Sequence, residues 1–135
     1  MAEKTFAMIK PDVVRSRSVG KIIDMIEQNG FTILRMEKMK LSREKAEEFY
    51  AVHKEKPFFG ELVDFIISGP VVAMALEKDG AITAWRELMG TTNPEQAAPG
   101  TVRQQFGTDI GQNAVHGSDA PETAEVELKI FFPDL

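Results

Sequence analysis

The chain has 135 residues, of which 43% are hydrophobic and 27% charged, and its formal net charge is −5. This length and composition predict one globular domain over residues 1–135, and the acidic balance argues against a surface that binds nucleic acid or anionic membranes as a whole. The absence of cysteine excludes disulfides and thiolate chemistry. With no apolar run of membrane-spanning length and no signal-like N-terminus, we expect a cytoplasmic protein.

The first part of the chain predicts a strand, a helix and a second strand. Residues 5–9 are apolar in partial alternation and are followed by Pro11, which indicates a short strand. Over residues 18–28 the apolar side chains recur at helical spacing, and an Asn-Gly pair then follows as a typical helix end. Residues 31–41 carry apolar side chains at even spacing, so we expect a second strand there.

The middle of the chain predicts three more helices and one strand. Ser42 can cap a helix that extends to residue 50 or 52, and Pro57 can begin another. Residues 71–76 are uniformly apolar, which is typical of a strand covered on both faces. An Asp-Gly turn follows, and residues 81–89 then show the spacing of a helix.

The last third contains a long segment, residues 90–112, that is rich in Gly, Pro, Thr and Asn and lacks clear periodicity. A structureless segment of this length is uncommon in a compact domain and is often functional. Residues 113–116 then predict a short strand, and residues 119–132 predict a helix.

The order of these elements contains a β-α-β-β-α-β core with two additional helices between the second and third strands and one after the fourth strand. This order predicts an α+β fold of the ferredoxin-like kind, a sandwich in which a four-stranded antiparallel sheet is covered by helices. The simplest form of that fold places the helices on one face of the sheet.

His116 is the strongest candidate for chemistry, because it is one of only two histidines and lies in a run of small and polar residues, 113–120. A neutral imidazole keeps a lone pair at pH 7 and can act as a nucleophile. Ala114 and Gly117 leave room on its approach side, and Ser118 can cap a following helix whose free N–H groups favour anions. From these residues alone, a histidine that simply binds a carboxylate near a helix start explains the pattern equally well.

Other classes of protein stay open at this point. The chain has neither a P-loop nor protein-kinase motifs, so an enzyme that moves phosphate would hold it with scattered side chains. A non-enzymatic nucleotide- or RNA-binding module on the same fold is the main alternative, although its first strand offers only Phe6 as an aromatic platform for RNA. A phosphorelay protein would place its histidine in the middle of a helix, and Gly117 disfavours that.

The run Asn-x-x-His-Gly-Ser-Asp at residues 113–119 resembles the signature of the nucleoside diphosphate kinases. The resemblance implies strand order 2-3-1-4 and transfer of the γ-phosphate of a nucleoside triphosphate to a nucleoside diphosphate. It also implies a ping-pong mechanism with broad base specificity, in which Nδ1 of His116 becomes phosphorylated. The same family is resembled, in the same order, by residues 5–12, 56–59, 68–73, 91–94 and 99–106.

The resemblance implies a catalytic group around the histidine. Glu127 would orient the imidazole and support its charge, Ser118 would hydrogen-bond near that carboxylate, and Tyr50 would orient the histidine or the phosphate. By residue pattern alone, Glu127 is equally a solvated carboxylate on a helix and Ser118 a helix cap.

The resemblance also implies a set of phosphate ligands. Lys10 would contact the sugar 3′-hydroxyl and the transferring phosphate. Arg86, Thr92 and Arg103 would form a phosphate clamp, because a guanidinium group binds phosphate oxygens with a planar fork of donors. His53 could approach a phosphate in the same pocket. Each of these residues alone is more often found simply on the surface.

The rest of the nucleotide would contact apolar and amide side chains. Phe58 would stack on the base with Ile110 on the other face, a contact that tolerates every base, while Phe59 is the better candidate for the core. Asn113 would bind the ribose hydroxyls.

The family also implies partners. Mg²⁺ would arrive bridging the β and γ phosphates, without a dedicated metal site on the protein. The end at Leu135 resembles short bacterial forms, and the family forms homo-oligomers, tetramers or hexamers built from dimers. We expect nucleoside di- and triphosphates as partners, and neither a membrane nor a specific nucleic acid.

Overall fold

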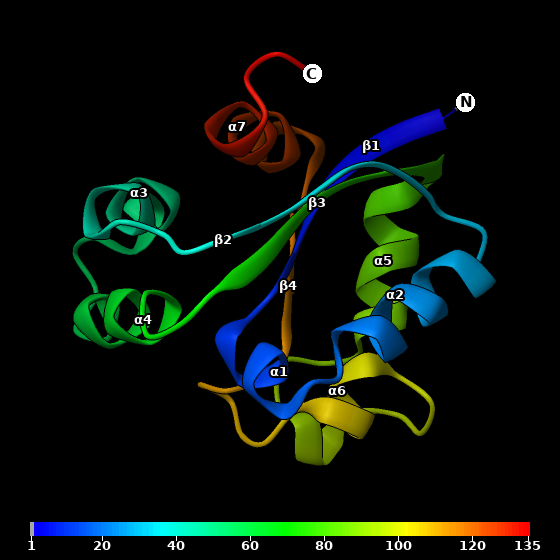
Figure 1. The fold of residues 1–135 in the computed structure, drawn as a ribbon, viewed down its shortest axis with the longest axis horizontal. Coiled ribbons are helices and arrows are strands. Elements are labelled where there is room, and N and C mark those ends of the chain that lie inside the picture. The colour runs from blue at the N-terminus through cyan, green and yellow to red at the C-terminus, as the bar shows by residue number, and fades with distance from the viewer. Residues whose placement is uncertain (1) are drawn as a thin grey trace.

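The computed structural model, which describes residues 2–135, contains one four-stranded antiparallel sheet in the order β2-β3-β1-β4 (Figure 1). β1 pairs with β3 and β4, while β2 pairs with β3 through a register irregularity between Ile33 and Arg35. This order confirms the ferredoxin-like fold. The strands are β1 (Ala2–Ile9), β2 (Thr32–Met39), β3 (Val71–Asp79) and β4 (Val115–Gly117).

Helices cover both faces of the sheet, so the expectation of a single covered face is wrong. The two helices that join the second and third strands pack on the opposite face from the two crossover helices of the core, and the C-terminal helix joins them there (Figure 1). One face carries α1 (Pro11–Ser16), α2 (Val19–Gln28), α5 (Ala81–Met89) and α6 (Val102–Phe106), and the other carries α3 (Arg43–Phe49), α4 (Phe59–Ile66) and α7 (Pro121–Phe131).

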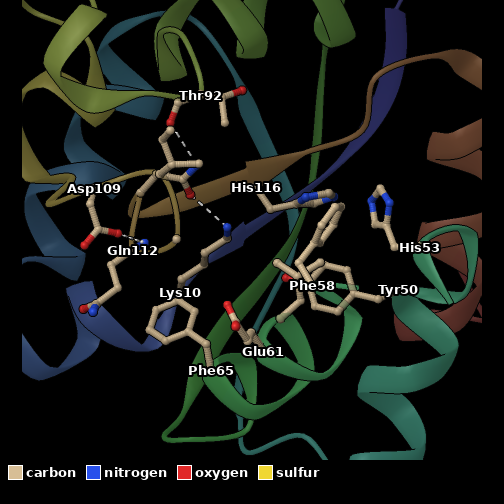
Figure 2. A pocket seen from close by; sticks show the side chains of 14 residues that line it. Lys10, Tyr50, His53, Phe58, Glu61, Phe65, Thr92, Asp109, Gln112 and His116 are labelled. Atoms are coloured by element: carbon tan, nitrogen blue, oxygen red, sulfur yellow. Dashed lines mark hydrogen bonds between the residues drawn. The ribbon is translucent and has the colours of Figure 1, made fainter. Parts of the chain in front are cut away.

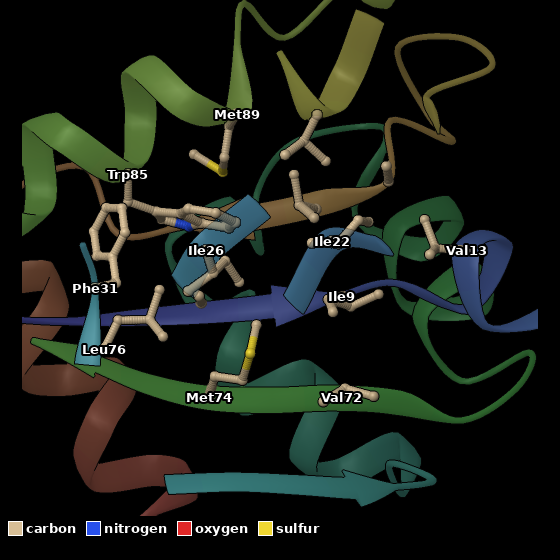
Figure 3. Packing of buried hydrophobic residues seen from close by; sticks show 14 of the residues in the cluster. Ile9, Val13, Ile22, Ile26, Phe31, Val72, Met74, Leu76, Trp85 and Met89 are labelled. Atoms are coloured by element: carbon tan, nitrogen blue, oxygen red, sulfur yellow. The ribbon is translucent and has the colours of Figure 1, made fainter. Parts of the chain in front are cut away.

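The core between the sheet and α2 and α5 follows from the period of two along the strands. Ile9 of β1 and Met74 of β3 point to this face, where Ile22 and Ile26 of α2 and Trp85 of α5 meet them (Figure 3). All five side chains are fully buried. This packing holds in place the C-terminal end of β1, which leads into Lys10.

The opposite core is rich in aromatic side chains. Phe6 of β1 stacks on Phe131 of α7 with ring centroids 4.6 Å apart, and Phe49 of α3 packs edge-on against both rings. Because Phe49 and Phe6 also contact the His116 ring, this core forms the floor behind the candidate nucleophile.

Three short helical segments were not predicted from the sequence. Pro11 begins α1 instead of only ending β1, as expected for proline at the first helical position. The segment 90–112 is not structureless, because it contains η2 (Pro94–Gln96) and α6. The side chains of Asn93 and Thr101 cap these two helices by accepting backbone N–H bonds at 3.1 and 3.3 Å.

The remaining boundaries lie close to those that the sequence predicts. α5 begins and ends where its spacing indicates, and Ser42 caps α3 by accepting the N–H of Lys45 at 3.1 Å. α4 begins at Phe59, two residues after Pro57, and η1 (Ala51–His53) follows α3. No helix within residues 2–135 combines the length and the apolar character needed to cross a membrane.

Candidate active site

A cavity of about 690 Å³ opens at the end of β1 and contains eight of the predicted site residues (Figure 2). Its walls come from β1, β4, the α3–α4 region and the loop before β4, which are far apart in the sequence. The predicted residues that line it are Lys10, Tyr50, His53, Phe58, Thr92, Ile110, Asn113 and His116, and the other lining residues include Glu61, Leu62, Phe65 and Gln112.

The His116 ring is held from behind by a buried carboxylate. Its Nε2 lies 3.1 Å from both oxygens of Glu127, and Ser118 Oγ donates to Oε1 of the same carboxylate at 2.7 Å. The Glu127 and Ser118 side chains are buried, whereas the His116 side chain is 23% exposed. A carboxylate at Nε2 favours the tautomer with the proton on that nitrogen, so Nδ1 keeps its lone pair. Nδ1 has no hydrogen-bond partner among the described residues.

The local backbone explains this arrangement and corrects two predictions. Ser118 does not cap α7, because Ala120 occupies that position without a side-chain bond and Pro121 begins the helix. Gly117 leaves room for the indole of Trp85, with which any side chain at 117 would collide, rather than on the approach side of the imidazole. The Trp85 indole N–H in turn donates to the His116 carbonyl at 3.1 Å and thereby fixes the strand that carries the candidate nucleophile.

Aromatic side chains also pack against the imidazole ring. Phe49 meets it edge-on, with ring centroids 4.8 Å apart, and Tyr50 is buried beside Phe49. Burial and the nearby charge of Glu127 raise the pKa of Tyr50, which therefore stays protonated and can donate a hydrogen bond. The sequence reading missed Phe49, because an apolar residue on a helix is indistinguishable from ordinary core.

Lys10 ends β1 inside the cavity instead of at a solvated strand end. Its Nζ donates to Asn113 Oδ1 at 2.8 Å, and Asn113 Nδ2 donates to the Thr92 carbonyl at 3.1 Å (Figure 2). Burial, and then the charge of Arg103, lower the pKa of Lys10 to about 8, although Asp12 counteracts this. Three predicted ligands thus form one connected group across a sequence separation of 103 residues.

The two predicted clamp arginines occupy different places. The guanidinium group of Arg103 is buried and donates to three backbone carbonyls, those of Gly90, Asn113 and Val115, at 3.0, 3.3 and 2.9 Å. Arg86 lines a neighbouring open cavity together with Asp119 and does not line the first one. Burial and the charge of Arg86 lower the pKa of Arg103 to about 10, which indicates that the two cations repel one another.

The outer end of the cavity is apolar and exposed. Phe58 and Ile110 are 42% and 60% exposed, so both present apolar surface to the open end of the cavity. His53 also lines the cavity, with its ring centroid 5.7 Å from that of Phe58 and 6.3 Å from that of Tyr50. Burial, and then the charges of Lys56 and His116, lower the pKa of His53.

The arrangement combines an oriented imidazole, a buried ammonium group and an exposed aromatic platform in one cavity. No three or more His, Asp or Glu side chains within residues 2–135 are grouped so that they could hold a metal ion. Such a cavity can place a polyanion next to a nucleophilic nitrogen while an aromatic ring covers an attached heterocycle.

Comparison with known proteins gives one consistent result. The family described as "Nucleoside diphosphate kinase" matches residues 3–135. Nucleoside diphosphate kinases of Oleidesulfovibrio alaskensis and Deinococcus radiodurans are 58% and 54% identical over 132 residues, which is 98% of this chain and 95% and 96% of the relatives.

Solved structures agree with the sequence relatives. The nucleoside diphosphate kinase of Aquifex aeolicus superimposes with a TM-score of 0.96 at 47% identity and covers 98% of this chain and 96% of its own. The halophilic enzyme of Halobacterium salinarum in complex with CDP gives 0.95 at 43% identity, covering 99% and 90%.

Proposed function

The chain belongs to the nucleoside diphosphate kinase family, and we propose that it transfers the γ-phosphate of a nucleoside triphosphate through a phosphohistidine on Nδ1 of His116. The observation that carries this proposal is the orientation of the ring. Because both oxygens of Glu127 lie 3.1 Å from Nε2, the lone pair of Nδ1 is the one left for the cavity.

In the first half-reaction, Nδ1 attacks the γ-phosphorus in line with the bond to the β–γ bridging oxygen. The P–N bond forms as that P–O bond breaks, and the nucleoside diphosphate leaves with the bond electrons. The ring becomes cationic, since Nε2 keeps its proton, and the Glu127 carboxylate offsets the new charge. In the second half-reaction, a β-phosphate oxygen of another nucleoside diphosphate attacks the phosphorus, and the imidazole regains its lone pair.

Cationic and hydroxyl side chains stabilise the transferring group. In this proposal the Lys10 ammonium group contacts the γ-phosphate and the 3′-hydroxyl, and Thr92 contacts a phosphate oxygen. Arg86 reaches the phosphates from the neighbouring cavity. Arg103 contributes its positive charge without binding the phosphates directly, because three of its N–H donors already bind backbone carbonyls. Tyr50 donates from its protonated hydroxyl toward the histidine or phosphate.

The nucleoside occupies the outer end of the cavity. Phe58 and Ile110 cover the two faces of the base, and Asn113 binds the ribose hydroxyls, which supports broad base specificity because stacking needs only a π face. The CDP bound by the Halobacterium salinarum enzyme supports placing a nucleoside diphosphate here. Mg²⁺ would arrive with the nucleotide and would neutralise phosphate charge, because residues 2–135 contain no group of three His, Asp or Glu side chains that could hold it.

We also propose that the protein forms a homo-oligomer built from dimers. β2 lies at the edge of the sheet and carries Met36, a large apolar side chain that is 52% exposed. Exposed edge strands pair readily with another chain. Light scattering after size-exclusion chromatography distinguishes a tetramer or hexamer from a monomer.

A single-turnover experiment tests the covalent route. Incubation with γ-labelled ATP and Mg²⁺ in the absence of acceptor is expected to give acid-labile, base-stable label, which any nucleoside diphosphate then removes. His116→Ala is expected to take up no label while still binding ADP, and His53→Ala, at the other histidine, controls for adventitious labelling. Label on a residue other than His116, or transfer with no labelled protein, contradicts the mechanism.

The family assignment favours this enzyme over a non-enzymatic nucleotide- or RNA-binding module. A folded protein that binds ADP and RNA equally well, and transfers no phosphate, would instead support the module.

A further inference from the structure

Asp12 lies at the start of α1, next to the nucleotide cavity but outside its lining. Its Oδ2 accepts a hydrogen bond from the backbone N–H of Ala114 at 3.2 Å. Its other oxygen, Oδ1, is buried and has no hydrogen-bond partner among residues 2–135. A buried carboxylate oxygen without a partner costs free energy, so this side chain requires an explanation beyond fold stability.

Ala114 has a backbone conformation that non-glycine residues rarely adopt. Its φ is +74°, in the left-handed region, and the residue is fully buried. Such a conformation persists only where the surroundings hold it. Both backbone groups of Ala114 are held, the N–H by Asp12 and the carbonyl by the backbone N–H of Lys10 at 2.8 Å.

The backbone conformation of Ala114 sets the direction in which the adjacent residue Asn113 points. Asn113 precedes it and sends its side chain into the cavity, where it joins Lys10 and Thr92. The backbone N–H of Val115 closes this turn by donating to the Asn113 carbonyl at 2.9 Å. Arg103 also donates to the carbonyls of Asn113 and Val115, and Asp12 is the side chain that binds the N–H of Ala114 between them.

The geometry points to Asp12 as a positioning residue for nucleotide binding: its carboxylate holds Ala114 in the left-handed conformation, which aims Asn113 and the Lys10 ammonium group into the cavity. This inference rests on the proposed function, in which Asn113 binds the ribose and Lys10 the phosphate. Asp12 itself acts only through these residues. Burial raises the pKa of its carboxyl, and the backbone N–H of Asp12 itself, then the charge of Lys10 and the N–H groups of Ala114 and Val13, counteract this.

The binding of ADP, measured by calorimetry at pH 7 on folded variants, tests this role. Asp12→Asn keeps an oxygen for the Ala114 N–H and is expected to bind ADP nearly as well as the unchanged protein. Asp12→Ala removes the acceptor and is expected to weaken binding about tenfold, the size typical of one hydrogen bond to a charged group. Because glycine adopts the left-handed conformation without strain, adding Ala114→Gly to Asp12→Ala is expected to restore most of the affinity.

Recovery of ADP affinity in the double variant distinguishes a positioning role of Asp12 from a purely structural one. If Asp12 only stabilised the start of α1, as an acidic residue in a first turn does, the losses of thermal stability from Asp12→Ala and Ala114→Gly would add and affinity would not recover. Ala114→Gly alone serves as the control and is expected to bind ADP normally.

Three outcomes overturn the inference: undiminished affinity in Asp12→Ala, no recovery in the double variant, or an Asp12→Asn protein as weak as Asp12→Ala. Should Asp12→Ala not fold, hydrogen exchange at the Ala114 amide in Asp12→Asn decides, with slow exchange supporting the inference and fast exchange refuting it. Failure of the proposed function is recognised separately, because it would appear as absent phosphoryl transfer in the unchanged protein.

Discussion

The two ends of the cavity are built in opposite ways. At the inner end, His116, Glu127 and Ser118 form a buried hydrogen-bonded chain with contacts of 2.7–3.1 Å. At the outer end, Phe58 and Ile110 present apolar surface that is 42% and 60% exposed. The inner end restricts the position of one nitrogen atom, whereas the outer end only offers a surface on which a flat ring can rest.

In the proposed function, this difference would let one cavity fix the position of the nucleophile and still accept different bases. In-line attack requires the nucleophile within a few tenths of an ångström of its productive position, which the buried Glu127 carboxylate and Ser118 hydroxyl would maintain by holding Nε2 of the ring. Base stacking depends on a π face that all nucleobases share. Changes at the inner end are therefore expected to lower turnover, and changes at the outer end to raise KM.

Glu127→Gln is expected to give the largest effect, because it keeps the shape of the side chain but removes the charge that offsets the cationic ring. Turnover should fall about a hundredfold, with KM nearly unchanged. Steady-state kinetics with several nucleotide pairs measure both constants. Glu125→Gln is the matched control, since Glu125 lies on the same helix, pairs with Lys129 on the surface and should not affect turnover. Near-normal turnover in Glu127→Gln would refute the role of this carboxylate.

Arg103→Lys is expected to destabilise the inner end. Lysine keeps the charge but cannot donate to the carbonyls of Gly90, Asn113 and Val115 together, so the free energy of unfolding should fall by about 2–3 kcal/mol. Urea denaturation monitored by the fluorescence of Trp85 measures it. Arg43→Lys provides the control, because Arg43 makes only a surface pair with Asp64. Equal midpoints for the two variants would contradict the structural role of Arg103.

Phe58→Ala tests the outer end. Loss of the stacking surface should raise KM about tenfold for adenine, guanine, cytosine and uracil nucleotides alike, with turnover close to normal. Val52→Ala removes another exposed apolar side chain, 84% accessible and outside the cavity, and should have no effect. A defect confined to one base, or a loss of turnover without a change in KM, would show that the two ends are not independent.

The smallest effect concerns pH and the ammonium group of Lys10. Its pKa is about 8 in the free protein, and bound phosphates should raise it because they favour the charged form. ADP binding at pH 8 should therefore take up about half a proton, and affinity should decline as pH rises above 8. Calorimetry in buffers of different ionisation enthalpy measures the uptake, which should vanish in Lys10→Met. Proton release on binding would mean that the sign of the linkage is wrong.

The helices and strands with clear periodicity could be predicted from the sequence because their signals are local. α2 shows apolar residues at helical spacing, and β3 is a continuous apolar run. α1 was missed because Pro11 is read equally as the end of a strand or the start of a helix. α6 was missed because five residues are too short for periodicity, although the cap at Thr101 was a usable signal.

The site was predictable to a different degree at each residue. The signature around His116 identified the candidate nucleophile, and the resemblance supplied Glu127, Lys10 and Phe58. It could not indicate that Arg103 would be occupied by backbone carbonyls, because a guanidinium group has the same chemistry whether it faces a ligand or its own chain.

The sequence by itself therefore determined the order and type of most elements, the family and the identity of the candidate nucleophile, all of which depend on local spacing or on short motifs. Only the tertiary structure decided that helices cover both faces of the sheet, that Nε2 of His116 lies against Glu127, and that Asp12 accepts the N–H of Ala114, whose φ is positive. These features depend on contacts between residues that are distant in the chain, up to 103 positions apart. Such contacts exist only after the sheet brings the end of β1 beside β4, and no local pattern of residues encodes their distances or directions.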